Sequence, residues 1–311
     1  MNSHLPDYRS KESRVLYIIG NGFDLYHKLP TKYEDFHQWL LKNHPRFEHN
    51  MNHIYGDENH ELWSNFEDAL GKNKSLYELH DYFGDKSLPR KEQQTHAATE
   101  IKRTLDNICP YLEEWAKTIE YECVRPLLPL GKGSKYVTFN YTRTLEEVYG
   151  IDGENTVLHI HGMIGQSNIE TGFRYGNDDF PIGSSLEEIS QENIKHELER
   201  MRKPTAKIFE RCQDFFKDLN QIRNVIVIGH SLSEIDLPYI KYLLPYLPSY
   251  PPIKYYYWVH TEKAKSEAAE HIKELCYQNS DIEGKMSKEL WEYHILDEYR
   301  YKNKNIYKQH N

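Results

Sequence analysis

The chain has 311 residues, of which 38% are hydrophobic and 13% aromatic, so it carries enough apolar side chains for a packed core and is not disordered throughout. Its 48 acidic and 39 basic residues give a formal net charge of −9, which argues against a protein that mainly binds nucleic acid, because phosphate binding needs clustered Lys and Arg. The length allows one large domain or two moderate ones.

The first predicted element is a buried strand at Arg14–Ile19, an apolar, β-rich run that ends in Gly20-Asn21-Gly22. From about Glu34 to Leu128 the apolar residues follow helical spacing, which predicts a long helical block after this strand. Pro110 is expected to kink or divide the second part of that block, because proline interrupts a helix interior.

Strand patterns resume beyond the helical block. They lie at Tyr136–Asn140, Thr156–Ile160, Asn224–Ile228, Lys254–Val259 and, more weakly, Trp291–Leu296. Helical patterns separate most of them, at about 142–149, 186–220 in two pieces, 234–247 and 261–278. Strands that alternate with helices predict a parallel sheet with right-handed crossovers.

We therefore predict an α/β fold, with a Rossmann-like parallel sheet and a large helical insertion after the first strand. The core is assigned to residues 1–34 and 131–311, and the insertion to residues 35–130. A second helical segment is expected within the core at residues 185–222. The polar stretch 162–185 is expected to be a loop at the carboxyl edge of the third strand.

Three further patterns limit the class of protein. No run of about 18 apolar residues occurs, so we expect no membrane-spanning helix. Residues 1–14 lack the apolar region of a secretory signal, and we expect a cytoplasmic protein. The cysteines form no C-x-x-C pair, which indicates neither a zinc ribbon nor a disulfide framework. They are Cys109, Cys123, Cys212 and Cys276.

Unusual polar segments follow four of the predicted strands. They are Gly20-Asn21-Gly22-Phe23-Asp24, Asn140-Tyr141-Thr142, His159-Ile160-His161-Gly162 and Gly229-His230-Ser231-Leu232. In parallel α/β sheets, ligands bind outside the carboxyl ends of the strands. The sequence therefore predicts a ligand site where these segments meet.

The Gly20-x-Gly22 pair can let backbone amides approach a pyrophosphate, or it can form a tight turn without a ligand. The third position of the dehydrogenase fingerprint is Leu25 rather than glycine. No acidic residue ends a strand about 20 positions later to hold a ribose. A dehydrogenase that transfers hydride is therefore not indicated.

Asn140 can orient a water or a ribose hydroxyl, or it can close its own turn, and Thr142 is expected to be the N-cap of the next helix. His159 and His161 would point the same way if their strand persists. His161, directly before Gly162, can act as a general base at the strand end. His159 is expected to be a satisfied core histidine. A metal-binding pair is the third interpretation, although only scattered acids could complete such a site.

The segment from Gly229 to Ser233 imitates the G-x-S-x-G nucleophile elbow of α/β-hydrolases. Ser231 would be the nucleophile, with Asp281 and His294 as partners, although Ser233 replaces the last glycine. A serine hydrolase is thus an alternative. It leaves the glycine pair and Asn140 without roles.

Together, the four segments resemble those of sirtuin-like nucleotide-binding proteins and, more closely, those of the AbiH family of bacterial abortive-infection proteins. The strings that carry the resemblance are Gly20-Asn-Gly-Phe-Asp24, Leu29-Pro30-Thr31-x-Tyr33-x-Asp35-Phe36, Thr138-Phe-Asn140, His161-Gly162 and Gly229-His-Ser-Leu232. In sirtuins the corresponding strings are the Gly-Ala-Gly-x-Ser loop that runs into Ile-Pro, the Thr-Gln-Asn strand end, the catalytic His-Gly and the Gly-x-Ser-Leu segment beside the adenosine ribose.

The departures from the sirtuin pattern are specific. The four-Cys zinc module of sirtuin deacylases is missing, Lys28 stands where the sirtuin loop has a small glycine, and Tyr33 stands in place of its arginine. The resemblance therefore implies a sirtuin-like fold without the zinc module and argues against a protein deacylase. Zinc-less sirtuin-like proteins in bacterial defence are often NAD-cleaving enzymes, so the resemblance implies NAD as the substrate.

The expected function is anti-phage abortive infection through hydrolysis of the nicotinamide–ribose bond of NAD, without a metal. The catalytic residues would be His161 as the base, Asn140 as the orienting group and Asp24 as the group that stabilises the cation or positions nicotinamide. The NAD contacts would come from Gly20, Asn21, Gly22, Phe23, Thr138, Tyr141, Gly162, Gly229, His230, Ser231, Leu232 and Asp236.

An alternative from another class is a nucleotide sensor without turnover, which would control a partner through the helical block. A homo-oligomer or a regulatory protein partner is compatible with either function.

Overall fold

The computed structural model describes most of the chain. The described residues are 14–56, 61–166, 169–172, 186–233, 235–249, 253–278, 286 and 290–296. Asp281 and most of the loop expected at 162–185 lie outside them. The described residues fall into two compact units. We call residues 14–30, 120–163 and 205–296 the sheet unit, and residues 31–119 and 164–204 the helical unit.

The sheet unit is built on six parallel strands. They are β1 (Val15–Ile19), β2 (Lys135–Thr138), β3 (Val157–His159), β4 (Asn224–Ile228), β5 (Lys254–Val259) and β6 (Trp291–Ile295). All five residues of β1 are buried, as expected for a central parallel strand that is covered on both faces. The strand predictions are confirmed, apart from small shifts of their ends.

The strand order is β3-β2-β1-β4-β5-β6. The chain runs from β1 outward to β2 and β3 and then crosses to β4, which pairs with β1 on its other side. The order therefore reverses between β1 and β4. This is the strand order of dinucleotide-binding Rossmann folds, in which ligands bind at the point of reversal. The predicted Rossmann-like α/β fold is confirmed.

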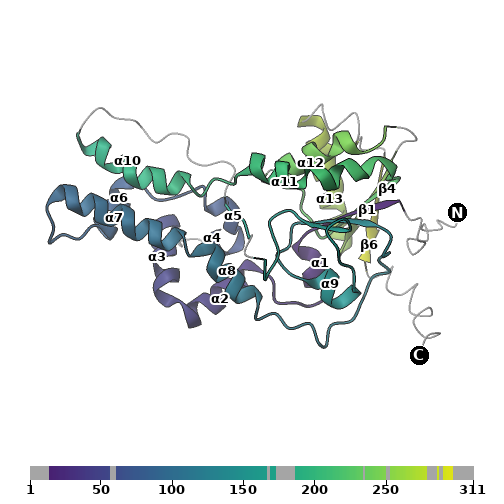
Figure 1. Ribbon diagram of the computed structural model, residues 1–311, viewed down its shortest axis with the longest axis horizontal. Helices are drawn as coiled ribbons and strands as arrows, with labels where there is room; N and C mark the ends of the chain where they lie inside the picture. The colour runs from purple at the N-terminus through teal and green to yellow at the C-terminus, as the bar shows by residue number, and fades with distance from the viewer. Residues whose placement is uncertain are drawn as a thin grey trace. The chain divides into compact units, whose positions relative to one another are not determined.

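Helices cover both faces of the sheet (Figure 1). They are α1 (Asn21–Tyr26), α9 (Thr144–Tyr149), α11 (Thr205–Lys217), α12 (Leu237–Leu243) and α13 (Glu262–Gln278), with short 3-10 turns at Asp218–Gln221 and Leu244–Tyr246. Because side chains alternate along a strand, Leu16 and Ile18 of β1 enter one core cluster, and Val15, Tyr17 and Ile19 enter the other. The sheet is thereby fixed between two apolar layers.

The helices of the helical unit are α2 (Tyr33–Asn43), α3 (Pro45–Tyr55), α4 (Glu61–Ser64), α5 (Phe66–Ala69), α6 (Leu76–Phe83), α7 (Arg90–Leu105), α8 (Ile108–Ala116) and α10 (Leu186–Glu199). All of them except α10 lie between β1 and β2 in the chain, as the helical spacing predicts. The expected division near Pro110 falls instead between α7 and α8, at 106–107. Pro110 lies in the first turn of α8, where its missing N–H is not needed.

One part of the expected domain division differs. Residues 185–222 were expected to be a helical segment within the core, but α10 packs against α6 and α7 and belongs to the helical unit (Figure 1). Only α11 and the 3-10 turn after it join the sheet unit. The pair Ile194 and Leu198 gives α10 a buried apolar face. Its spacing predicts a packed helix but not which surface the helix packs on. No helix of the described residues is long and apolar enough to cross a membrane.

Candidate active site

The loops that follow β1 and β4 meet at their glycines. Gly20 donates its backbone N–H to Ile228 O at 3.1 Å, and Gly22 donates to Gly229 O at 2.8 Å. A Cβ on Gly22 would lie 2.6 Å from Gly229 Cα, and one on Gly229 would lie 2.3 Å from Phe23 N. No side chain fits between these two loops, so glycine is required for their contact at the reversal point.

This contact changes the role expected for the glycine pair. The N–H groups of Gly20 and Gly22, expected to cradle a pyrophosphate, are already donated to carbonyl oxygens of the β4 segment. The glycines therefore hold the start of α1 against the end of β4. His260, directly after β5, adds a hydrogen bond of 3.0 Å from Nε2 to Gly22 O.

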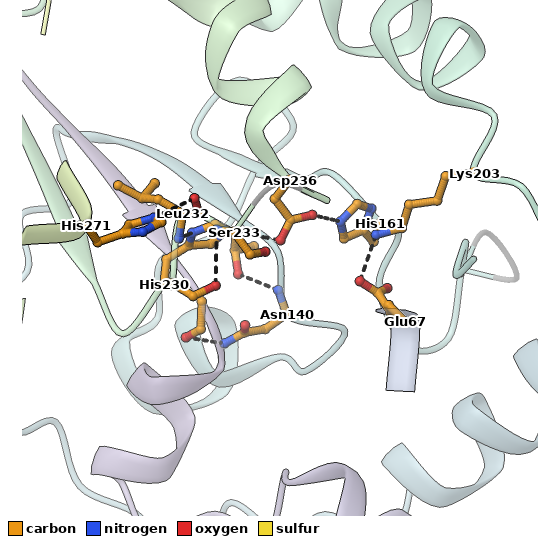
Figure 2. A network of polar contacts seen from close by, with 12 residues as sticks. Glu67, Asn140, His161, Lys203, His230, Leu232, Ser233, Asp236 and His271 are labelled. Atoms are coloured by element: carbon orange, nitrogen blue, oxygen red, sulfur yellow. Dashed lines mark hydrogen bonds and ion pairs between the residues drawn. The ribbon is translucent and has the colours of Figure 1, made fainter. Parts of the chain in front are cut away.

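Asn140 follows β2 and reaches the end of β1. Its Nδ2 donates to Gly20 O at 3.1 Å, and its backbone N–H donates to Thr138 Oγ1 at 3.2 Å (Figure 2). The residue is 9% exposed. Because Nδ2 is held by Gly20, the orientation of the amide is fixed, and its Oδ1 accepts no hydrogen bond from the described residues. This oxygen remains as an acceptor for a ligand or a water.

Asp24, in α1, is a fully buried carboxyl group. Burial raises its pKa to about 6, and the hydroxyls of Thr142 and Thr144 and the nearby His159 oppose the rise. Thr142 Oγ1 donates to Oδ2 at 2.5 Å, whereas Oδ1 has no hydrogen-bond partner among the described residues. The prediction that Thr142 caps the next helix was wrong, because α9 starts at Thr144 and the hydroxyl serves Asp24.

The buried carboxyl group should make stability depend on pH. Folding raises the pKa of Asp24 from 3.8 to about 6, so the folded state binds the proton more tightly than the unfolded chain. The resulting stabilisation is complete below about pH 4 and is lost as the pH rises through 6. Relative to Asp24→Asn, the wild type should lose about 2 kcal/mol of unfolding free energy between pH 4 and pH 7.

Urea unfolding of both proteins across this pH range measures the difference. Asp152→Asn, at an exposed position of the same unit, is the matched control and should follow the wild type. Parallel pH profiles for the wild type and Asp24→Asn would show that Asp24 titrates equally in both states.

Two buried histidines share the carboxylate of Asp236. His161 Nε2 lies 3.2 Å from Oδ1, and His230 Nε2 lies 3.4 Å from Oδ2 (Figure 2). Leu232 donates its backbone N–H to His230 Nδ1 at 2.9 Å, so the proton of His230 sits on Nε2 and faces the carboxylate. Asp236 is placed to hold His161 in its Nε2–H form, the role that the acid plays in catalytic triads.

The two histidines of the His-x-His pair have separate environments. Because β3 ends at His159, His161 lies in the following turn rather than on the same strand face. His159 Nδ1 bonds to Asn140 O at 3.1 Å and its Nε2 to Glu146 Oε1 at 3.0 Å, which confirms a satisfied core histidine. A metal held by the pair would have to break these bonds. His161 instead contacts the ring of Tyr239, with centroids 5.2 Å apart.

Ser231 lacks the setting of a hydrolase nucleophile. Its Oγ accepts a hydrogen bond from Ser233 N at 3.3 Å, and no histidine of the described residues bonds to it. The left-handed backbone in this turn belongs to Leu232, with φ of 54°, rather than to Ser231. His294 lies within β6, and Asp281 is outside the described residues. The geometry therefore gives the hydrolase alternative no catalytic pair.

The remaining predicted residues lie around this centre. Phe23 is buried, and its ring packs on His27 with centroids 4.6 Å apart. The ring of Tyr141 lies 6.5 Å from that of His161. Gly162 adopts φ of 83° and donates its N–H to His159 O, while Asn21 is the first residue of α1.

Other residues in contact with the site carry no motif. Tyr257 donates its hydroxyl to His230 O, and His271 bonds to Leu232 O at 3.0 Å. His260 could have been found from the sequence, because it directly follows a predicted strand. Tyr257 and His271 lie inside a strand and a helix, and only the packing of β5 and α13 brings them to the β4 loop.

A family model described as "Bacteriophage abortive infection AbiH" matches residues 16–257, a range that includes all four polar strand ends. The chain belongs to the AbiH family. Its membership indicates a role in bacteriophage abortive infection and confirms the AbiH resemblance of the sequence motifs. No curated protein and no solved structure matches this AbiH-family chain.

Proposed function

We propose that this AbiH-family protein acts in phage defence by hydrolysing the nicotinamide–ribose bond of NAD. The observation that carries the proposal is the position of Asn140 and of the His161–Asp236 pair. They lie at the carboxyl ends of the strands, in a sheet whose order reverses between β1 and β4. Dinucleotides bind at this place in sheets of this order.

The chemistry of the bond explains why these side chains suit the reaction. Cleavage of an N-glycosidic bond develops positive charge on the ribose and needs a nucleophilic water. His161 with its proton on Nε2 carries a lone pair on Nδ1, which accepts a proton from the water or from a ribose hydroxyl. The Asp236 carboxylate stabilises the imidazolium that forms. Asn140 Oδ1 orients the water or the ribose hydroxyl.

Asp24 supplies the third polar group of the proposal. With a pKa of about 6, its carboxyl group is mostly ionised at neutral pH. A negative charge in a buried environment stabilises a nearby cation more strongly than the same charge in water. Asp24 would therefore favour the oxocarbenium character of the ribose above pH 6.

The site is nearly closed to solvent, since His161 is 3% exposed and Asn140 is 9% exposed. Binding of a substrate to these groups would therefore require a local rearrangement of the packing around them. Such a requirement suits a defence enzyme that must stay inactive until infection. A regulatory partner or a second copy of the chain could control activity by promoting or blocking this rearrangement.

The test is a time course of the purified chain with NAD, in which nicotinamide and ADP-ribose are separated by chromatography. Equimolar release of both products supports the proposal. Thermal stabilisation by NAD or ADP-ribose without product would favour the sensor alternative. If NAD gave no product and did not stabilise the protein, NAD would be overturned as the ligand.

A further inference from the structure

The helical unit contains a cavity of its own, with a volume of about 140 Å³. Its lining residues come from α3, α7, the turn after α7 and α8. In the helical unit α3 packs against α7 (Figure 1). Pockets for drug-sized molecules measure about 300–1,000 Å³, so this cavity is too small to enclose a dinucleotide. It can enclose only part of a ligand of mononucleotide size.

Two arginines from different helices meet at one edge of the cavity. Arg46 of α3 lies 3.3 Å from Glu100 Oε2, and Arg103 of α7 lies 3.9 Å from Glu100 Oε1. One carboxylate faces two guanidinium groups, which leaves a net positive charge. Each arginine side chain is more than 70% exposed, at 80% and 72%, and the contacts with Glu100 involve Nη2 of Arg46 and Nη1 of Arg103. The other N–H groups can bind an anion, for which the planar guanidinium favours phosphate.

Two asparagines line the cavity with fixed amide groups. Asn50 Nδ2 donates to Thr104 Oγ1 at 3.0 Å, and Asn107 Nδ2 donates to Arg103 O at 2.6 Å. These bonds orient both amides, so each Oδ1 is the remaining acceptor. Neither oxygen accepts a hydrogen bond from the described residues. Two amide acceptors among the lining residues suit a ligand that carries an amine.

Aromatic rings complete the lining. Phe47 and Tyr111 meet edge to face, with centroids 4.8 Å apart, and His44 stacks on Tyr111 at 3.8 Å. These contacts hold the rings of Phe47 and Tyr111, which line the cavity, in fixed positions. The cavity thus combines donors for an anion, acceptors for an amine and a wall for a flat ring.

We propose that this cavity binds a nucleoside monophosphate whose base carries an exocyclic amine. The phosphate would bind to Arg46 and Arg103 in competition with Glu100, and the amine would donate to the Asn50 and Asn107 oxygens. Because the ligand would join α3 to α7, its binding would stabilise the helical unit. This site does not depend on the NAD proposal, since it uses none of the residues of the sheet unit.

The test is isothermal titration calorimetry of the full chain with AMP. Inosine monophosphate has the same purine frame and phosphate but lacks the amine, and it should bind roughly tenfold more weakly. Inorganic phosphate should bind more weakly still. Equal affinities for AMP and inosine monophosphate would overturn the role of the amine. Equal affinities for AMP and phosphate would overturn the assignment of a nucleotide.

Variants place the ligand in this cavity. Arg103→Gln and Arg46→Gln should each weaken AMP binding by roughly 10- to 100-fold, because each removes a charge-assisted hydrogen bond. Lys102→Gln, at the neighbouring position of α7, removes the same charge next to the cavity and should leave the affinity unchanged. AMP affinity that is unchanged in both arginine variants, or no binding to the wild type, would overturn the proposal.

Discussion

His161→Gln is expected to lower the rate of NAD cleavage by at least about 100-fold while the protein stays folded. Glutamine can still donate an N–H to the Asp236 carboxylate, so the buried acid keeps a partner. It cannot accept a proton as a neutral imidazole does. The variant therefore separates proton transfer from the structural contact of His161 with Asp236, which spans 75 positions of the sequence.

Initial rates of nicotinamide release from the wild type and the variant, at saturating NAD, measure this effect. His196→Gln, whose side chain in α10 is 72% exposed, is the matched control and should react at the wild-type rate. Thermal unfolding of all three proteins checks that they are folded. If His161→Gln kept a rate near that of the wild type, His161 would have no part in the chemistry.

Gly229→Ala is expected to destabilise the protein by roughly 2–5 kcal/mol. The added Cβ would lie 2.3 Å from Phe23 N and 2.4 Å from Gly22 C, and both atoms belong to the backbone. The loops after β1 and β4 would have to separate. The φ of 60° adds further strain, because this region is unfavourable for any residue with a side chain.

Gly150→Ala separates the effect of backbone strain from the effect of the steric clash between the two loops. Gly150 has nearly the same φ, 58°, but a Cβ there would meet only the flexible end of Lys132 at 3.4 Å. It should therefore show the backbone strain alone, about 1–2 kcal/mol. Urea unfolding of both variants gives the comparison. Equal losses of stability would contradict a requirement for close contact between the two loops.

The sequence predicted the elements of the sheet unit because their signals are local. Runs such as Asn224–Ile228 and Lys254–Val259 are apolar and β-rich throughout, and the structure has strands at the same residues. The alternation of strands and helices was enough to predict a parallel α/β sheet. It did not give the position of α10, because an apolar helix face does not identify its partner.

The order of the strands came only from the tertiary structure, since β1 pairs with β4 across more than 200 residues of sequence. The same applies to the expected pyrophosphate loop. The Gly-x-Gly pattern indicates that something approaches the backbone closely at these glycines. From the pattern alone, the approaching group could be a bound phosphate or another segment of the chain. In the structure the segment that approaches is the end of β4.

The sequence by itself determined which polar residues end the strands, and with them the family and the place of the candidate site. The tertiary structure decided what each of them does. It joined His161 and His230 through Asp236, directed the Thr142 hydroxyl to Asp24 and enclosed that carboxyl group until its pKa rose. Strand and turn signals depend on neighbours in the chain, whereas hydrogen-bond partners and burial depend on residues that only folding brings together.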